Sequence, residues 1–404
     1  MHYLSVIICI LLLPTAPGRK DSSPFIVEEE DGVLLVPQLI RKYGYQMEEH
    51  EVRTEDGYLL SVYRILGRGD TRKSPILMMH SLFSSCADWV AIGPKNALGY
   101  LLADRGYDIW LGNARGNRYG RKHESLTVDI PGFWNFTFHE IAVYDVTATI
   151  DYVLEQTNAE KLHYIGFSQG TLVGFVALSS RPEYNEKIIE VQQLSPAVYI
   201  NRNLSVIIRL LVFFVREIAL AYNAIGKNDF LSHFDGQYEF FRKICPAPDQ
   251  TICRAVVYDV AGANPQQLGV KIARIFLGHF PAGSSLKQVM HIAQLIRDGI
   301  FRQYDYGNSA QNIAAYGSPS PPLYDLSRVT APVRIYYGYN DNVVNYRNIP
   351  RLERDLPNLL SSYPVPDKLF SHVDFILAKN VRKVLYKEII KNVERAERDY
   401  TFEP

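Results

Sequence analysis

A serine flanked by glycines, two residues away on either side, is the first feature of this chain that could do chemistry. The segment Gly166-Phe167-Ser168-Gln169-Gly170 follows a short apolar run (162–165) and precedes small and apolar residues (171–178). A serine in a sharp turn between a strand and a helix projects its hydroxyl away from the backbone. Larger side chains at the two outer positions would collide with that turn, which explains both glycines. The pattern predicts that Ser168 is a nucleophile, and the alternative is an ordinary Gly/Ser loop.

A nucleophilic serine needs a base, and the base needs an acidic residue that orients it. In a strand–turn–helix setting of this kind the three residues follow in the order Ser, Asp or Glu, His. Asp341 comes shortly after a predicted strand at 331–338, and His372 is the only histidine beyond it. We therefore predict that Asp341 is the acid and His372 the base. Taken alone, each has a plainer interpretation, as a turn aspartate and as a surface or helix-capping histidine.

Asp374 is a competing acid, but it lies two residues from His372 and is badly placed to reach the ring Nδ1. Capping of the helix that begins near Phe375 is its better interpretation.

The oxyanion of an acyl-transfer reaction needs backbone N–H donors. One donor is expected from Gln169, directly after the serine and at a helix N-terminus. The second is expected from the loop His80-Ser81-Leu82-Phe83, which follows an apolar strand at 75–79, and Leu82 is the predicted donor. This loop can also be an ordinary strand exit with a structural His80.

The order of predicted elements indicates an α/β fold with a mostly parallel sheet covered by helices on both faces. Strands at 75–79, 107–111, 162–165, 188–194 and 331–338, most of them largely apolar, alternate with helical segments, after two strands around a turn at 49–66. The alternation stops between residues 199 and 324. We expect a core built from 19–198 and 325–404, with 199–324 inserted as a mainly helical cap over the edge of the sheet where ligands bind.

Composition excludes some partners. Lys and Arg together number 43, as do Asp and Glu, so the formal charge is zero and no basic face for nucleic acid is implied. An apolar stretch at 206–220 is interrupted by three charges, so we expect a buried or lipid-facing helix rather than a membrane span. No His/Cys cluster is spaced for a metal, and no cofactor is expected.

The N-terminus predicts a secreted or lysosomal protein. An apolar stretch at 4–13 is too short to cross a bilayer and precedes small residues at 16–18, as in a signal peptide over 1–18. An uncleaved anchor or a buried first segment is the alternative. Sequons at Asn135 and Asn203 agree with the secretory route, and no retention signal ends the chain. In an oxidising compartment Cys245 and Cys253, which lie close together in a loop-like stretch, would pair, leaving Cys86 as a buried free thiol.

Several segments in order give the chain a strong resemblance to the acid lipase family of gastric and lysosomal lipases, from about residue 33 to 393. They are Thr54–Tyr58, His80–Val90, Trp110–Asn117, Phe133–Glu140, Gly166–Gly170, Pro321–Asp325, Asp341 and Ser371–Phe375. The resemblance implies the same triad of Ser168, Asp341 and His372, oxyanion donors at Leu82 and Gln169, and a Cys245–Cys253 disulfide in the cap. Two positions depart from the family pattern: Ser81 stands where Gly is usual, and Phe167 where His is usual. A positive φ at Ser81 would strain the oxyanion loop, whereas Phe167 would change only the shape of the acyl pocket.

These observations together predict a serine ester hydrolase that cleaves neutral lipids, triacylglycerol or cholesteryl ester, at a lipid–water interface. An acid pH optimum follows from the resemblance alone. The alternatives are a hydrolase-fold lipid carrier or storage protein without turnover, and a general carboxylesterase.

Overall fold

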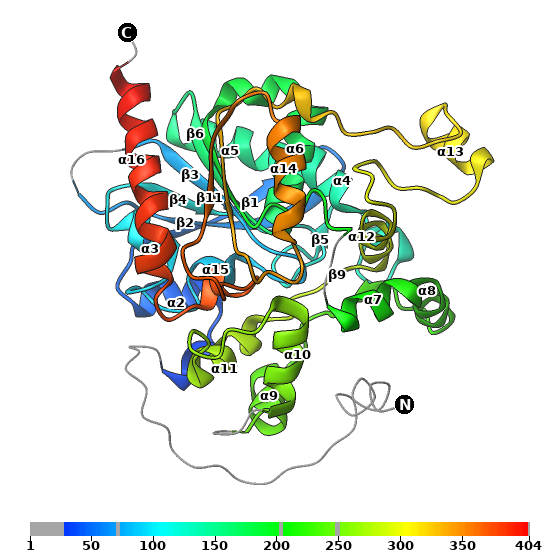
Figure 1. The fold of residues 1–404 in the computed structure, drawn as a ribbon, viewed down its shortest axis with the longest axis horizontal. Helices are drawn as coiled ribbons and strands as arrows, with labels where there is room; N and C mark the ends of the chain where they lie inside the picture. Colours follow the sequence, from blue (N-terminus) through cyan, green and yellow to red (C-terminus); the bar gives the residue numbers. More distant parts are fainter. Residues whose placement is uncertain (1–27, 70–72, 202–204, 247–250, 403–404) are drawn as a thin grey trace.

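The computed structural model describes residues 28–69, 73–201, 205–246 and 251–402 (Figure 1). The predicted signal peptide and Asn203 lie outside the described residues. Within them, no helix is long and apolar enough to cross a membrane.

The centre of the molecule is one large sheet, mostly parallel, as the sequence predicted. Its strands lie in the order β1-β2-β4-β3-β6-β7-β10-β11, with β5 paired to β2. The pairs β1/β2, β2/β4 and β2/β5 are antiparallel, and the remaining pairs are parallel. The strands span Met47–Arg53 (β1), Tyr58–Ile65 (β2), Pro75–Met79 (β3), Asp108–Leu111 (β4), Lys122–His123 (β5), Leu162–Phe167 (β6), Ile188–Leu194 (β7), Val333–Tyr337 (β10) and Leu359–Pro364 (β11).

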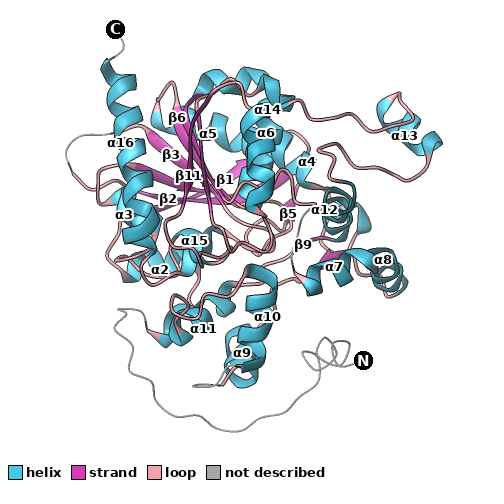
Figure 2. Ribbon diagram, viewed as in Figure 1, coloured by secondary structure: helices cyan, strands magenta, loops and turns pink. Residues whose placement is uncertain are grey.

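Helices cover both faces of this sheet (Figure 2). Alternate residues of β3 point to opposite sides: Leu77 and Met79 belong to one apolar cluster, Ile76 and Met78 to the other. Every residue of β3, β6 and β7 is buried. Of these strands only β3 is a continuous apolar run, because β6 also buries His163 and β7 also buries Glu190, Gln192 and Gln193. One face is covered by Thr147–Thr157 (α5), Gln169–Ser180 (α6) and Ile349–Asp355 (α14), and the other by Val36–Lys42 (α2), Leu98–Ala103 (α3) and Lys387–Phe402 (α16).

The described residues of 199–324 form a group of helices and one small two-stranded sheet, placed together on one side of the molecule apart from α13 (Figure 1). The helices span Val206–Phe213 (α7), Val215–Ala224 (α8), Gln237–Ile244 (α9), Thr251–Ala261 (α10), Val270–His279 (α11), Leu286–Asp298 (α12) and Ser309–Tyr316 (α13), and the small sheet pairs Asp229–Phe230 (β8) antiparallel with Ser284–Ser285 (β9). We call 199–324 the helical insertion.

The apolar stretch at 206–220 is two helices rather than one. Phe214 lies between α7 and α8 with a φ of −98° and a ψ of 12°, which interrupts the helix. No side chain of α7 is buried, and α8 buries only Ala219. The stretch is therefore not a buried helix, and its apolar residues lie at the surface.

Candidate active site

Ser168 lies in the turn between β6 and α6. Its φ is 52° and its ψ −111°, an unusual conformation for a residue with a side chain. A side chain at Gly166 would meet the backbone of Gly170, and one at Gly170 would overlap the carbonyl of Met79 in the neighbouring strand. Neither glycine has a positive φ, so lack of space, and not backbone conformation, requires glycine at both positions.

The structure brings the three predicted triad residues together. The Ser168 Oγ lies 2.9 Å from the Nε2 of His372, and the opposite ring nitrogen, Nδ1, lies 2.8 Å from Oδ2 of Asp341. All three are at least nine-tenths buried. Asp341 follows β10, and His372 lies in the loop between β11 and α15 (Asp374–Leu377). Asp341 and His372 are 31 positions apart in the sequence, and Ser168 and His372 are 204 apart. The carboxyl ends of the parallel strands bring them together at one edge of the sheet.

The Asp341 carboxylate is oriented by its own turn. Its Oδ1 accepts hydrogen bonds from the backbone N–H of Val343, at 2.9 Å, and of Val344, at 2.8 Å. The competing Asp374 does not reach His372: its carboxylate accepts the N–H of Ser371 and the amide of Asn264. It also does not cap α15, whose N-cap is Val373 without a side-chain hydrogen bond, so that prediction was wrong. Asp374 instead joins the His372 loop to the helical insertion.

A second serine, which the sequence analysis missed, contacts the acid side of this arrangement. Ser195 follows β7 and is fully buried. Its hydroxyl donates to Oδ2 of Asp341 at 2.7 Å and lies 3.1 Å from the Nδ1 of His372. Nothing in the local sequence Leu194-Ser195-Pro196 marks it as part of a site.

The C-terminal end of α10, in the helical insertion, holds both loops of the triad. The carbonyl of Ala261 accepts the N–H of His372 at 2.9 Å and the N–H of Asn342 at 3.3 Å. Gly262, with a φ of 101°, comes so close to the carbonyl of Asn340 that a Cβ there would overlap it. The loops that carry Asp341 and His372 are thus fixed from outside by one turn of the insertion.

The predicted oxyanion loop is fixed by a buried carboxylate. Asp88 accepts the backbone N–H of Ser81 at 2.9 Å, the Ser81 hydroxyl at 2.8 Å and the Ser84 hydroxyl at 2.5 Å. Burial raises the pKa of Asp88 to about 6, and the two hydroxyls and the N–H oppose that shift. The condition for strain at Ser81 is not met: among the described residues of this loop, the positive φ belongs to Phe83, at 58°. Ser81 therefore adds a hydrogen bond where the family pattern has none.

The oxyanion donors themselves stay a prediction. Gln169 is the first residue of α6, so its N–H has no acceptor one turn earlier in the helix. Its side chain accepts a hydrogen bond from the amide of Gln288 in α12. Leu82 lies in the loop that Asp88 holds, between Ser81 and Phe83. The helical insertion therefore contacts the residue after Ser168 as well as the triad loops.

His80 and Phe167 have structural roles. The Nε2 of His80 accepts the N–H of Ala114, and its Nδ1 donates to the Ser81 carbonyl at 2.7 Å. Burial lowers the pKa of His80 to about 4, which keeps this ring neutral. Phe167 packs against the His372 ring at 5.1 Å between centroids and against Phe375, so it lies behind the imidazole.

Cys245 and Cys253 form a disulfide at the start of α10, and Cys86 is a buried free cysteine. Asn135 is exposed, and its side-chain oxygen accepts from Lys287. Its glycosylation, like that of Asn203, stays a prediction. Among the described residues, no three His, Cys, Asp or Glu side chains are grouped to hold a metal ion.

Comparison with known proteins agrees with this geometry. A model described as "alpha/beta hydrolase fold" matches residues 74–377, and one described as "Partial alpha/beta-hydrolase lipase region" matches 36–93. The chain is 41% identical to Lipase 1 of Drosophila melanogaster, over 90% of this chain and 80% of that protein. It is 33% identical to the gastric triacylglycerol lipase of Bos taurus, over 90% and 92%. The chain belongs to the acid lipase family of α/β-hydrolases.

The fold is also shared with more distant structures. A soluble variant of monoglyceride lipase from Saccharomyces cerevisiae is similar with a TM-score of 0.54 and 14% identity, over 88% of this chain and 98% of that chain. At this identity the similarity concerns the fold alone. The resemblance inferred from the sequence motifs is thus confirmed at the level of family and fold.

Gly262→Ala tests how strongly the helical insertion holds the triad. The added Cβ meets the Asn340 carbonyl, so the α10 turn and the Asp341 loop must separate. We expect the free energy of unfolding to fall by about 2–4 kcal/mol, and ester hydrolysis to fall by about a hundredfold, since a shift of about 1 Å suffices for that loss. Gly317→Ala is the control, because Gly317 has a positive φ of 68° and no atom within 4 Å. Equal activity in the two variants contradicts the coupling.

Asp88→Asn tests the buried carboxylate by its effect on stability against pH. Because burial raises the pKa of Asp88 to about 6, the folded protein keeps a proton that the unfolded chain releases near its ordinary value of 3.8. The contribution of this proton to the free energy of unfolding is therefore complete below about pH 4. It is lost as the pH rises through about 6, a decrease on the order of 3 kcal/mol. The variant lacks this loss.

Urea unfolding at pH 4, 5, 6 and 7 measures the difference between wild type and Asp88→Asn, with the exposed Asp129→Asn as control. A difference that stays constant over this range argues against a buried carboxyl with a raised pKa.

Proposed function

We propose that this protein hydrolyses carboxylic esters of neutral lipids through an acyl-enzyme on Ser168. The observation that carries the proposal is the continuous contact from the Ser168 hydroxyl to the His372 ring to the Asp341 carboxylate, at 2.9 and 2.8 Å. These distances are those of hydrogen bonds, as a nucleophile and its base require.

In the first half of the reaction the Ser168 Oγ attacks the ester carbonyl carbon while the Nε2 of His372 takes the hydroxyl proton. The carbonyl oxygen becomes an oxyanion, stabilised by the N–H groups of Gln169 and Leu82. Asp341 holds the Nδ1–H of the ring and stabilises the imidazolium that forms. The tetrahedral intermediate then collapses, the C–O bond to the alcohol breaks, and His372 gives its proton to the leaving oxygen.

In the second half, water replaces the alcohol. His372 takes a proton from the water, whose oxygen attacks the acyl carbon, and a second oxyanion forms at the same donors. The bond to Ser168 then breaks, the proton returns to its Oγ and a fatty acid leaves. Both halves use the same residues, so one arrangement of the ring serves them both.

The class of substrate is proposed from the relatives and from the surface of the helical insertion. Relatives that cover most of the chain bear the names gastric triacylglycerol lipase and lipase member K. On α7, α8 and the turn that follows, Phe213, Leu220 and Ile225 are 76%, 70% and 71% exposed. Apolar side chains gathered at this exposure mark an interaction surface. We call the exposed apolar side chains of 206–225 (Val206, Phe213, Phe214, Leu220 and Ile225) the apolar face and propose that it contacts the lipid–water interface.

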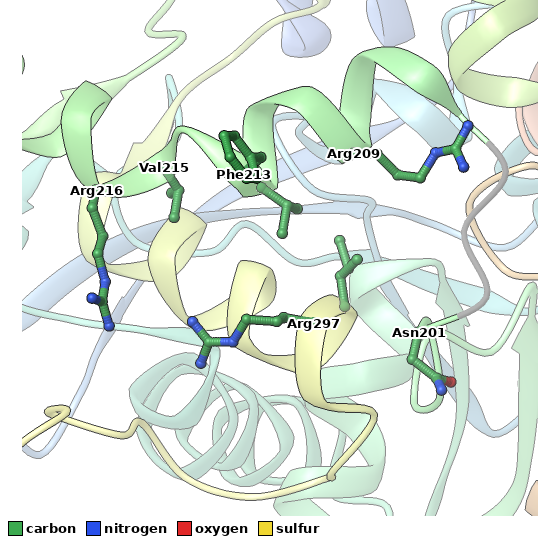
Figure 3. A pocket seen from close by; sticks show the side chains of 8 residues that line it. Asn201, Arg209, Phe213, Val215, Arg216 and Arg297 are labelled. Atoms are coloured by element: carbon green, nitrogen blue, oxygen red, sulfur yellow. The ribbon is translucent and has the colours of Figure 1, made fainter.

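A pocket of about 490 Å³ lies next to the apolar face, between α7, α8 and α12, and shares Phe213 with it (Figure 3). Four apolar side chains, three arginines and one asparagine line it: Val212, Phe213, Val215, Ile296, Arg209, Arg216, Arg297 and Asn201. None of the triad residues lines it, so it is separate from the site of bond cleavage. Arg297 is paired with Asp298, and the other two arginines, Arg209 and Arg216, favour an interface that carries negative charge, as one does when fatty acids accumulate on it.

The domain arrangement and the location of the protein are part of the proposal. Residues 19–198 and 325–404 form the catalytic core, and the helical insertion is its cap. A signal peptide over 1–18 and the Cys245–Cys253 disulfide suit a secreted or lysosomal enzyme. A lipid carrier without turnover and a general carboxylesterase are the competing functions, and the two experiments below separate them.

Ser168→Ala tests the nucleophile. Without the hydroxyl no acyl-enzyme can form, so kcat for a p-nitrophenyl ester should fall by about a millionfold, as for removal of the serine from other triads. A fluorophosphonate probe should label the wild type at Ser168 and leave the variant unlabelled. Ser180→Ala, on the same helix, is the matched control and should keep full activity and labelling. A wild type that the probe does not label supports the carrier function.

Phe213→Asp tests the apolar face and the substrate class together. The wild type should prefer emulsified long-chain esters over soluble acetate esters. The variant should lose about tenfold or more of its rate on the emulsion, because a charge opposes insertion of α7 into lipid, and keep its rate on the acetate. Leu360→Asp, an exposed leucine of β11, is the control. A wild type with its optimum at acetate supports a general carboxylesterase instead.

A further inference from the structure

The acid side of the triad contains a residue that no motif assigns. Ser195 begins the loop after β7, and its side chain is completely buried. Its hydroxyl donates to Oδ2 of Asp341 at 2.7 Å, the same oxygen that accepts the Nδ1–H of His372 at 2.8 Å. The distance from the Ser195 Oγ to Nδ1 itself is 3.1 Å. Ser195, Asp341 and His372 therefore form a closed triangle of polar contacts.

Ser195 cannot share the role of Ser168. The two serines lie at opposite nitrogens of the same ring, Ser168 at Nε2 and Ser195 at Nδ1. The Nδ1 of His372 carries its proton toward Asp341 and cannot act as a base for Ser195, and Nε2, the nitrogen that can take a proton, faces Ser168. Ser195 is also fully buried, whereas Ser168 is 6% exposed. The hydroxyl of Ser195 can act on the reaction only through its two neighbours.

We propose that Ser195 is a positioning residue for the triad, an inference that rests on the proposed function. By donating to Asp341, its O–H completes the hydrogen bonds of the carboxylate, whose Oδ1 already accepts the N–H groups of Val343 and Val344. The Ser195 Oγ also lies close enough to Nδ1 to share, as a second acceptor, the hydrogen bond that Nδ1–H donates to Asp341. Both contacts favour the tautomer that carries its proton on Nδ1 and leaves Nε2 free to take the proton of Ser168.

The backbone of Ser195 supports a functional role for this position. Its φ is 53°, a left-handed conformation that disfavours residues with a side chain and suits glycine. Its N–H is bound to the Tyr336 carbonyl at 2.8 Å, which holds the turn in place. Glycine would fit this backbone at lower cost, so the hydroxyl is the feature that a serine adds here.

Ser195→Gly and Ser195→Ala separate the hydroxyl from the backbone. Both remove the O–H, but only alanine keeps a Cβ in the left-handed conformation, so the glycine variant should be the more stable of the two. We expect kcat on a soluble ester to fall about tenfold in both variants, the effect of one hydrogen bond to a charged group, with KM unchanged. Asn158→Ala, at the exposed left-handed end of α5, controls for backbone strain. Wild-type kcat in Ser195→Gly overturns the inference.

A double-mutant cycle with Asp341→Asn then tests the route of the effect. The aspartate variant alone should lose about 10⁴ in kcat, because the ring loses its orienting charge. If Ser195 acts through Asp341, adding Ser195→Gly to that variant should lower kcat by less than twofold. A further tenfold loss would mean that Ser195 acts by general support of the fold and overturns the inference. Failure of the proposed function looks different, since Ser168→Ala would then keep its turnover.

Discussion

One imidazole ring, held between a hydroxyl and a carboxylate, is the constraint on which the rest of this structure depends. His372 must present Nε2 to Ser168 and Nδ1 to Asp341 at the same time, and the three residues come from three loops. A parallel sheet solves this geometric problem because its strand ends lie at one edge and its strands fix the spacing of the loops. The order β6, β7, β10, β11 places the serine turn, the Ser195 turn, the Asp341 loop and the His372 loop side by side.

The sheet alone does not complete the site, because the helical insertion holds the same loops from the other side. The last turn of α10 binds the backbone of both the Asp341 and His372 loops through one carbonyl, that of Ala261. Gln288 of α12 binds the side chain of Gln169. A movement of the insertion to admit a lipid therefore has to leave the end of α10 in place, or it would disturb the ring. The start of α7 is tied to the same helix, because Asp259 of α10 accepts the N–H groups of Val206 and Ile207.

The sequence was sufficient for the fold and the three triad residues because these leave local patterns. Continuous apolar strands, the glycines around Ser168 and the order of serine, aspartate and histidine are each visible within a few residues. Ser195, Asp88 and Gln288 left no such pattern. Their importance comes from contacts with residues many positions away, such as the 146 positions between Ser195 and Asp341, and from hydroxyl and amide groups that are common throughout any chain.

One wrong prediction has an identifiable physical origin. The prediction that Asp374 caps the following helix followed the local rule for helix starts, but an amide of the insertion, on Asn264, binds this carboxylate instead. A contact outside the local segment therefore decided the role of this side chain. At Ser81, strain was expected only for a positive φ, and the turn places its positive φ two residues later, at Phe83.

Backbone strain at the site is held by distant parts of the fold. Among the described residues, five non-glycine residues have a positive φ, and three of them, Phe83, Ser168 and Ser195, lie on the loops around the triad. Such conformations cost on the order of 1–3 kcal/mol each. Each is fixed by a backbone hydrogen bond to another element: Ser168 to β7 through Leu194, Ser195 to β10 through Tyr336, and Phe83 to Ala282 of the insertion.

The strained turns are therefore stable only when neighbouring strands and the helical insertion are already in place. A fragment that contains the serine turn but lacks β7 would lose the hydrogen bond that holds Ser168. A core without the insertion would lose the hydrogen bond that holds Phe83. The proposed nucleophile, the Ser195 hydroxyl and the predicted oxyanion loop thus take up their positions as consequences of the complete fold. The same dependence explains why the residues that hold them are spread from β3 to the loop after β11 rather than gathered in one motif.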